Sequence, residues 1–309
     1  MNPPSTDQRD QLVIRFADAF AVIACDDATV RHEMGRLFRH CRHETMPAAS
    51  TVPSVALTIR RDDDAAFVLF GAGSTPCRLS SALDLLERVL YEVTVGLATS
   101  SQSAMVVHGA GLVVRDFGIL LVGPSGSGKS TLTTRCLVAG YDFLSDEAVA
   151  VDRERNDLHG FARPIALKNP NVAFGNSEIR GDYDHVGHGS SGICYLDPER
   201  LRSGSVRTRS PLNVLVFPTY TAAGPDEFRR LTPAQTVFRL MPRIVNAQRL
   251  PRRGFDSAVA VATATPAYAL GYSRAERAIQ WLERIVAECS SFDDLPPPVQ
   301  RRQYPAIDC

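Results

Sequence analysis

Short apolar runs and helix-spaced apolar stripes alternate along the N-terminal third of the chain. Runs at 11–25 predict one hairpin, and runs at 55–60 and 66–70 predict a second. Apolar positions three and four residues apart predict helices at 30–38 and 83–97. This part of the chain is therefore predicted to be a small α+β region, in which no group of side chains indicates a chemistry of its own.

Strand-like apolar runs dominate from Met105 onward, and helices are few. Only one clear helix is indicated between the early runs, so the pattern is poorer in helices than a doubly wound nucleotide-binding fold. We predict an α+β chain in three parts: an N-terminal region at 1–103, a second domain at 104–289, and an extended or disordered tail at 290–309. The predicted strands of the second domain are 105–107, 112–114, 119–122, 148–151, 164–167, 193–196 and 214–217.

Two capping boxes predict where late helices begin. Thr232 is followed by Pro233 and then by Gln235, and Ser273 is followed three residues later by Glu276. In such a box the first side chain caps the helix, while the glutamine or glutamate bonds back to the capping residue. Both boxes are signals of fold rather than of function.

The composition limits the classes of partner and compartment. The 309 residues are 44% hydrophobic and 22% charged, and Lys+Arg and Asp+Glu both count 34, so no global positive charge indicates nucleic-acid binding. No apolar run approaches a membrane span, and the polar N-terminus lacks a signal-peptide pattern. The scattered cysteines are typical of reduced thiols in a cytoplasmic protein. His40, Cys41 and His43 are interpreted as a helix end, because structural zinc requires four ligands.

The most informative stretch is a glycine-rich loop between a predicted strand and a predicted helix. Gly123, Gly128, Lys129 and Ser130 match the phosphate-loop pattern G-x-x-x-x-G-K-[ST]. In such a loop the backbone N–H groups cradle phosphates, the lysine contacts the outer ones, and the serine hydroxyl holds Mg²⁺. The order strand, loop, helix places the phosphates at a helix N-terminus, which favours anions. The predicted nucleotide-binding residues are Gly123, Pro124, Ser125, Gly126, Ser127, Gly128, Lys129, Ser130 and Thr131.

Two adjacent acids, Asp146 and Glu147, open the strand-like run that follows the loop helix. Phosphoryl transfer assisted by a metal needs a second acid beside the loop. One carboxylate can hold Mg²⁺, and the other can accept the proton of an attacking hydroxyl. We therefore predict that this pair belongs to the same site as the loop.

Three segments together resemble the catalytic domain of the HPr kinase/phosphorylase family, and more closely its bacterial HPr kinase-related members. The segments are His108-Gly109-Ala110, the loop from Gly118 to Ser130, and Gly140 to Glu147. The resemblance covers roughly 104–288 and extends through Arg163–Asn169, Val216–Tyr220, Asn246 and Pro266–Tyr268. It implies a mixed, bent β core with few helices, like the nucleotide domain of phosphoenolpyruvate carboxykinase. It also implies ATP-dependent phosphorylation of a serine hydroxyl on a protein, or on a natural-product precursor peptide in some relatives.

The resemblance assigns roles to individual residues. It places Lys129 on the transferring phosphates and Ser130 on Mg²⁺, with Asp146 nearer the metal and Glu147 as the better candidate for general base. Glu178, in Glu178-Ile179-Arg180-Gly181, matches a family residue that helps at the metal. The predicted catalytic residues are thus His108, Lys129, Asp146 and Glu147, and the predicted metal ligands are Ser130, Asp146 and Glu178.

Several residues keep two interpretations. His108 is either a phosphate-side histidine that donates or shuttles protons, or a hydrogen-bonded histidine of the core. Lys168 is either a phosphate or substrate contact or an exposed lysine at a strand end. The pair Arg252-Arg253 is either a source of transition-state charge or a solvated loop.

The leading functional hypothesis is an ATP- and Mg²⁺-dependent kinase that acts on a hydroxyl of a peptide or small protein. Two alternatives remain: an ATP-binding scaffold of a peptide-modifying assembly, favoured by the change from the family's Asp-Asp to Asp146-Glu147, and a small-molecule hydroxyl kinase. Neither nucleic acid nor membrane is an expected partner. The family resemblance also implies a homo-oligomer, without fixing the number of subunits, and the N-terminal region is open to acceptor binding or subunit contact.

Overall fold

A computed structural model describes residues 10–45, 51–71, 75–168 and 193–290 of the chain. Two predictions lie outside these residues: the metal role of Glu178 and the extended tail after residue 290. Within them the chain forms seven α-helices and two mixed β-sheets, together with a small two-stranded sheet. The predicted combination of helices and mixed sheets is therefore present.

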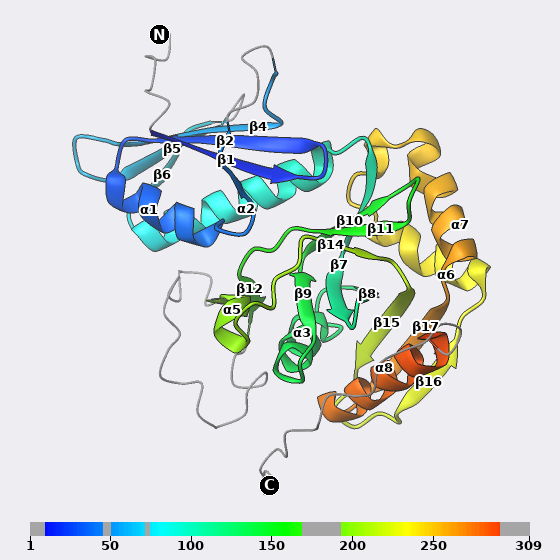
Figure 1. Cartoon of the computed structure of the whole chain (residues 1–309). Helices are drawn as coiled ribbons and strands as arrows, with labels where there is room; N and C mark the ends of the chain where they lie inside the picture. The colour runs from blue at the N-terminus through cyan, green and yellow to red at the C-terminus, as the bar shows by residue number, and fades with distance from the viewer. Residues whose placement is uncertain (1–9, 46–50, 72–74, 169–192, 291–309) are drawn as a thin grey trace, which may run out of the picture.

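The N-terminal sheet has six strands in the order β3-β1-β2-β4-β5-β6. Both predicted hairpins are confirmed, because β1 pairs antiparallel with β2, and β4 pairs antiparallel with β5. The predicted helices are confirmed as α1 and α2, and both lie against one face of this sheet (Figure 1). The bounds are β1 Gln11–Phe16, β2 Ala19–Cys25, α1 Ala28–Leu37, β3 Arg42–His43, β4 Val55–Arg61, β5 Phe67–Gly71, β6 Cys77–Leu79 and α2 Ala82–Ser100.

The second sheet has nine strands, with the order β14-β11-β10-β7-β8-β15-β17-β16 and with β9 paired to β7. Strands β8, β15 and β17 are parallel neighbours, and the other pairs are antiparallel. A separate hairpin is formed by β12 and β13. The bounds are β7 Ala104–Val114, β8 Phe117–Val122, β9 Asp142–Ser145, β10 Ala148–Asp152, β11 Asp157–Gly160, β12 Ile165–Leu167, β13 Cys194–Leu196, β14 Arg209–Pro211, β15 Val214–Tyr220, β16 Glu227–Arg230 and β17 Ala267–Tyr272.

Helices cover both faces of the second sheet. Apolar side chains of α3 and α8 form one core with one face, and those of α6, α7 and the short helices between them form another core with the opposite face. Thr232 and Gln235 make the predicted reciprocal capping bonds at the start of α6. The Ser273 hydroxyl instead donates to Asp226. The bounds are α3 Lys129–Val138, α5 Pro198–Leu201, α6 Pro233–Leu240, η3 Met241–Arg243, η4 Ala247–Arg249, η5 Pro251–Gly254, α7 Phe255–Ala264 and α8 Ala275–Ser290.

The two regions share a hydrophobic core. The N-terminal core of sheet and helix side chains continues into Ala104, Val106, Ala148, Ala150 and Phe161 of the second region. The helices α1 and α2 therefore lie between the N-terminal sheet and the second region rather than on a free surface. The boundary near residue 103 separates the two sheets in sequence, while the packing runs across it.

Two details of the strand prediction are wrong. The runs at 105–107 and 112–114 belong to one strand, β7, because the glycines between them continue the extended backbone. The sequence pattern also missed strands β9, β11, β14, β16 and β17. Most of these are short, and their places depend on long-range pairing, which a local pattern does not report.

Candidate functional site

The middle of β7 brings two distant segments together. His108 pairs with Ala148, which directly follows the acid pair, and Gly109 pairs with Val122, which directly precedes the glycine-rich loop. The acids lie in the short break between β9 and β10, and both of these strands pair with β7. The register of one strand therefore places the loop and the acids next to each other, although they are distant in sequence.

The loop leaves the N-terminus of α3 without a side-chain cap. Gly126 and Gly128 have φ angles of 84° and 91°, in the left-handed region that favours glycine. Gly128 is the N-cap of α3 and no side chain bonds to the first-turn amides there. A Cβ at Gly128 would collide with the Tyr272 hydroxyl and would lie 3.0 Å from Tyr220 Cβ. The backbone N–H groups of this turn are consequently available to an anion.

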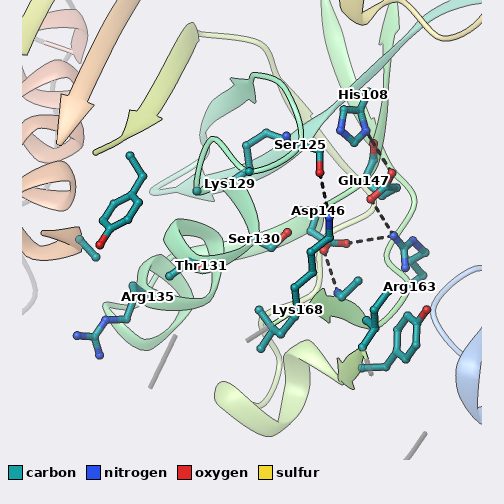
Figure 2. Close-up of a pocket in the computed structure, with 18 of the residues that line it drawn as sticks. His108, Ser125, Lys129, Ser130, Thr131, Arg135, Asp146, Glu147, Arg163 and Lys168 are labelled. Atoms are coloured by element: carbon teal, nitrogen blue, oxygen red, sulfur yellow. Dashed lines mark hydrogen bonds and ion pairs between the residues drawn. The ribbon is translucent and has the colours of Figure 1, made fainter. Parts of the chain in front are cut away.

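The loop lysine folds back over the loop. Lys129 Nζ donates to the backbone oxygens of Gly123 and Pro124, at 2.8 and 3.0 Å. Burial lowers the pKa of Lys129, and the charges of Glu147 and Asp146 oppose that shift. Lys168 Nζ lies 3.2 Å from Ser125 Oγ, so a second ammonium group reaches the loop (Figure 2). Two lysine ammonium groups thus contact the loop, and both lysines line the same pocket.

Asp146 is a buried acid with one oxygen left without a hydrogen bond. Asp146 is only 1% exposed, and its Oδ2 accepts a hydrogen bond of 3.1 Å from the Ala166 amide. Oδ1 lies 4.0 Å from Arg163 Nη2 and has no hydrogen-bond partner among the described residues. Burial raises the pKa of Asp146 to about 6, against the lowering effect of the Arg163 charge.

Glu147 is held by partners on both sides. His108 Nδ1 lies 3.2 Å from Glu147 Oε1 and 3.1 Å from its backbone oxygen, and Arg163 Nη2 donates to Oε2 at 3.1 Å (Figure 2). Burial acts to raise the pKa of Glu147. The hydrogen bond from His108 and the charges of Arg163, His108 and Lys129 outweigh it and lower that pKa to about 2. The adjacent acids are therefore unlike: Glu147 is a paired, weakly basic carboxylate, and Asp146 is buried and only partly bonded.

One pocket of about 700 Å³ joins these groups. Figure 2 shows His108, Glu147 and Arg163 on one side, Arg135 on the other, and Ser130 and Lys129 between them. The pocket is lined by residues of the loop and α3, the acid pair, the β12–β13 hairpin, α2, and the segment that joins β17 to α8.

Most of the predicted site residues line this pocket, and some do not. Its lining includes His108, Ser125, Gly126, Gly128, Lys129, Ser130, Thr131, Asp146, Glu147 and Lys168. Gly123, Pro124 and Ser127 lie in the loop but outside the lining, where Gly123 and Pro124 hold the lysine through their backbone oxygens. Arg252 and Arg253 belong to η5 and do not line the pocket.

Sequence reasoning missed Arg163 and the contribution of α2. In the sequence Arg163 is only part of a stretch that resembles the family, yet its side chain is 6% exposed and reaches both acids, at 4.0 Å from Asp146 Oδ1 and 3.1 Å from Glu147 Oε2. Arg163 lies just before β12, where the local sequence predicts a loop. Nothing in that local sequence predicts an ion pair with the acids. The pocket residues of α2 belong to a stretch with ordinary helical spacing of apolar residues. Nothing in the sequence distinguishes these pocket residues from residues of the hydrophobic core.

No group of three or more His, Cys, Asp or Glu side chains among the described residues could hold a metal ion by itself, but two oxygen donors of the pocket have the chemistry that magnesium requires. Mg²⁺ prefers oxygen ligands and is commonly held by one or two carboxylates together with the phosphates of a nucleotide. Ser130 and Asp146 both line the pocket, and the unbonded Oδ1 of Asp146 supplies the kind of oxygen that such an ion would use. Of the residues that the structure describes, Ser130 and Asp146 are the ones that would hold the metal.

Comparison with known proteins gives a distant similarity to HPr kinase/phosphorylases. No family model matches the chain. The HPr kinase/phosphorylase of Clostridium acetobutylicum is 24% identical over 188 residues, which cover 60% of this chain and 56% of the relative. Those of Clostridium perfringens strains are 28% identical over 94 residues, covering 30% of this chain and 28% of each relative. The chain thus spans about half, or less, of the length of these relatives.

A solved structure was also matched. The HPr(Ser) kinase/phosphatase from Coxiella burnetii aligns with a TM-score of 0.32 and 15% sequence identity, over 60% of this chain and 93% of that one. Across the described residues, no helix combines the length and the apolar character needed to cross a membrane. The cytoplasmic location and the homo-oligomer stay predictions.

Proposed function

We propose that the chain is an ATP- and Mg²⁺-dependent kinase that phosphorylates a serine, or a similar hydroxyl, of a peptide or small protein. The observation that carries this proposal is the joining of an uncapped helix N-terminus, two ammonium groups and two adjacent acids, of which Asp146 is buried, in one pocket. The distant similarity to HPr kinase/phosphorylases supports the same activity. A phosphate-binding turn alone would serve many nucleotide proteins, whereas the acids beside it favour transfer to a hydroxyl.

The loop would bind the triphosphate. The first-turn amides of α3 donate to phosphate oxygens, and Lys129 moves its donors from the Gly123 and Pro124 carbonyls to the same oxygens. Lys168 adds charge from the opposite side of the loop. Ser130 and Asp146 would hold a magnesium ion, which would neutralise more of the phosphate charge.

The transfer step then needs position and charge more than a strong base. The acceptor oxygen attacks the γ-phosphorus, the bond from that phosphorus to the ADP oxygen breaks, and the hydroxyl proton passes to a carboxylate of the pair. Glu147, the expected base, has a pKa of about 2 and is a weak proton acceptor. We therefore propose that Glu147 mainly fixes His108 and Arg163 around the transferring group, and that positioning and electrostatics supply most of the rate.

Labelled ATP tests the activity directly. The full chain is incubated with Mg²⁺, γ-labelled ATP and a mixture of serine-containing peptides, and phosphoserine is identified by mass spectrometry. A Lys129→Ala preparation controls for contaminating kinases, because it removes the loop ammonium from the same fold. Nucleotide binding without transfer to any peptide, protein or metabolite hydroxyl would contradict the proposal and favour the scaffold alternative.

A further inference from the structure

One wall of the pocket comes from the N-terminal region. Helix α2 contributes Leu90, Tyr91, Thr94 and Val95 to the lining. Leu90 and Thr94 are buried, whereas Tyr91 and Val95 are 59% and 39% exposed. Residues four apart lie on the same face of a helix, so Tyr91 and Val95 form one exposed apolar strip along the pocket.

The β12–β13 hairpin and the residue before β13 add more apolar surface. Leu167, Ile193 and Tyr195 line the same pocket. Tyr195 packs against the N-terminal core and pairs with Ala166 in the hairpin, and the Ala166 amide donates to Asp146, so the hairpin lies beside the buried acid. We call the surface made by Tyr91, Val95, Leu167, Ile193 and Tyr195 the apolar wall.

The opposite end of the pocket has a different character. It is lined by Arg135, Arg274, Glu276, Tyr220 and Tyr272, and Arg135 forms an ion pair with Glu276 at 2.7 Å. In Figure 2 Arg135 lies on the far side of the loop lysine and serine from Glu147 and Arg163. The phosphate loop thus lies between this polar end and the acids (Figure 2).

We propose that the apolar wall receives the phosphate acceptor, and that this acceptor is a peptide segment carrying an apolar or aromatic side chain beside its serine. The inference rests on the proposed kinase function. The reacting hydroxyl must approach the acids, and the hairpin that contacts Asp146 through the Ala166 amide carries Leu167 and Tyr195 of the apolar wall into the same pocket. A small polyol would leave that surface in water, whereas a neighbouring side chain of a peptide would cover it.

A positional peptide library tests this. Each peptide has one central serine in a glycine-rich background, with one flanking position varied among Leu, Phe, Ser, Asp, Lys and Gly, and glycerol is included as a small hydroxyl compound. With the wild-type chain we expect kcat/KM for the Leu or Phe peptides to exceed that of the glycine peptide by about tenfold, the usual scale for filling an apolar subsite.

Two variants locate the subsite. Tyr91→Ala and Val95→Ser should each raise the KM for the preferred peptide by about tenfold, because each removes binding that the acceptor has equally in the ground state and the transition state. The KM for ATP should stay within about twofold of the wild type. Val259→Ser on α7, 38% exposed, and Phe238→Ala on α6, 82% exposed, are matched controls outside the pocket and should change neither KM. Thermal unfolding of all four variants verifies that each is folded.

The outcomes separate this inference from the function on which it rests. Phosphorylation of peptides without a flanking preference, or a preference that survives both α2 substitutions, would overturn the acceptor assignment while leaving the kinase function intact. Better transfer to glycerol than to any peptide would overturn both the acceptor assignment and the peptide as substrate, and would favour the small-molecule hydroxyl kinase. ATP binding with no transfer to any hydroxyl compound would instead overturn the kinase function, and the acceptor assignment with it.

Discussion

The chain makes two strand-to-helix junctions that look alike and end differently. At the first, β2 leads into α1, and Asp27 Oδ1 accepts hydrogen bonds from the Thr29 and Val30 amides, both at 3.0 Å. At the second, β8 leads into α3, and Gly128 offers no side chain to the first-turn amides. The first helix N-terminus is satisfied by an acid of the protein itself, while the second remains available to an anion from outside.

Function in this fold resides at the junction whose helix N-terminus is uncapped. Both junctions have the same local physics, a partial positive charge at a helix N-terminus. The first uses it for stability, and its acid is also paired with Arg61 at 2.8 Å. The second omits the cap and instead has Lys129 folded over the loop and a buried acid across the pocket. We expect substitutions at the first junction to change stability, and substitutions at the second to change the chemistry.

Asp146→Asn should have the largest effect. The change keeps an oxygen for the Ala166 amide and removes the charge that the proposed metal requires, so phosphoryl transfer should fall by about 10³-fold. Glu147→Gln is the matched comparison, and a loss of only about tenfold is expected because Glu147 is already a weak base. Initial rates with labelled ATP measure both. A loss for Glu147→Gln as large as that for Asp146→Asn would contradict the minor, positioning role proposed for Glu147.

Gly128→Ala should weaken ATP binding by about 100-fold. The new Cβ needs a positive φ and also collides with the Tyr272 hydroxyl, so the uncapped turn must distort. Gly126→Ala is the matched control: it has a similar φ, but no atom lies within 4 Å of the added Cβ. Its loss should stay near tenfold, which is the cost of the backbone conformation alone. Titration with a fluorescent ATP analogue measures both, and equal losses would mean that the close contact is irrelevant.

The second junction was predictable because its signals are local. An apolar run, spaced glycines and Lys129-Ser130 lie within one short stretch, as do Asp27 and the apolar stripe of α1. The contacts of Glu147 with His108 and Arg163 were not predictable, because they depend on the register of β10 against β7 and on the path of the chain into β12. The place of Tyr91 on the pocket wall depends on how two sheets pack through α2, which a helix-spaced stripe does not reveal.

Asp27→Ala should affect stability and leave the chemistry unchanged. The substitution removes two capping bonds and the pair with Arg61, and we expect the free energy of unfolding to fall by about 1–2 kcal/mol. Phosphoryl transfer at a temperature well below unfolding should stay within about twofold of the wild type. Urea denaturation and the labelled-ATP assay measure the two quantities. A large loss of transfer in a folded Asp27→Ala protein would break the separation between the junctions.

The acids of the two junctions should also titrate in different pH ranges. The hydrogen bond from the Val30 amide, together with Arg61, lowers the pKa of Asp27, so its cap stays ionised at pH 5 and its stabilisation is lost only as pH falls through that lowered pKa. Burial raises the pKa of Asp146 to about 6, so half of this group is protonated at pH 6.

Mg²⁺-dependent ATP binding should therefore weaken by about twofold at pH 6 and by about tenfold at pH 5, relative to pH 7 and after correction for protonation of ATP itself.

Stability should move in the opposite direction over the same range. An acid whose pKa is higher in the folded than in the unfolded protein takes up protons on folding, so lowering the pH from 7 to 5 stabilises the fold. Isothermal titration calorimetry and thermal unfolding at pH 7, 6 and 5 measure the two trends. Asp146→Asn removes the titrating carboxyl and should lose both, and parallel trends in the wild type would contradict the assignment of this pKa to a buried metal ligand.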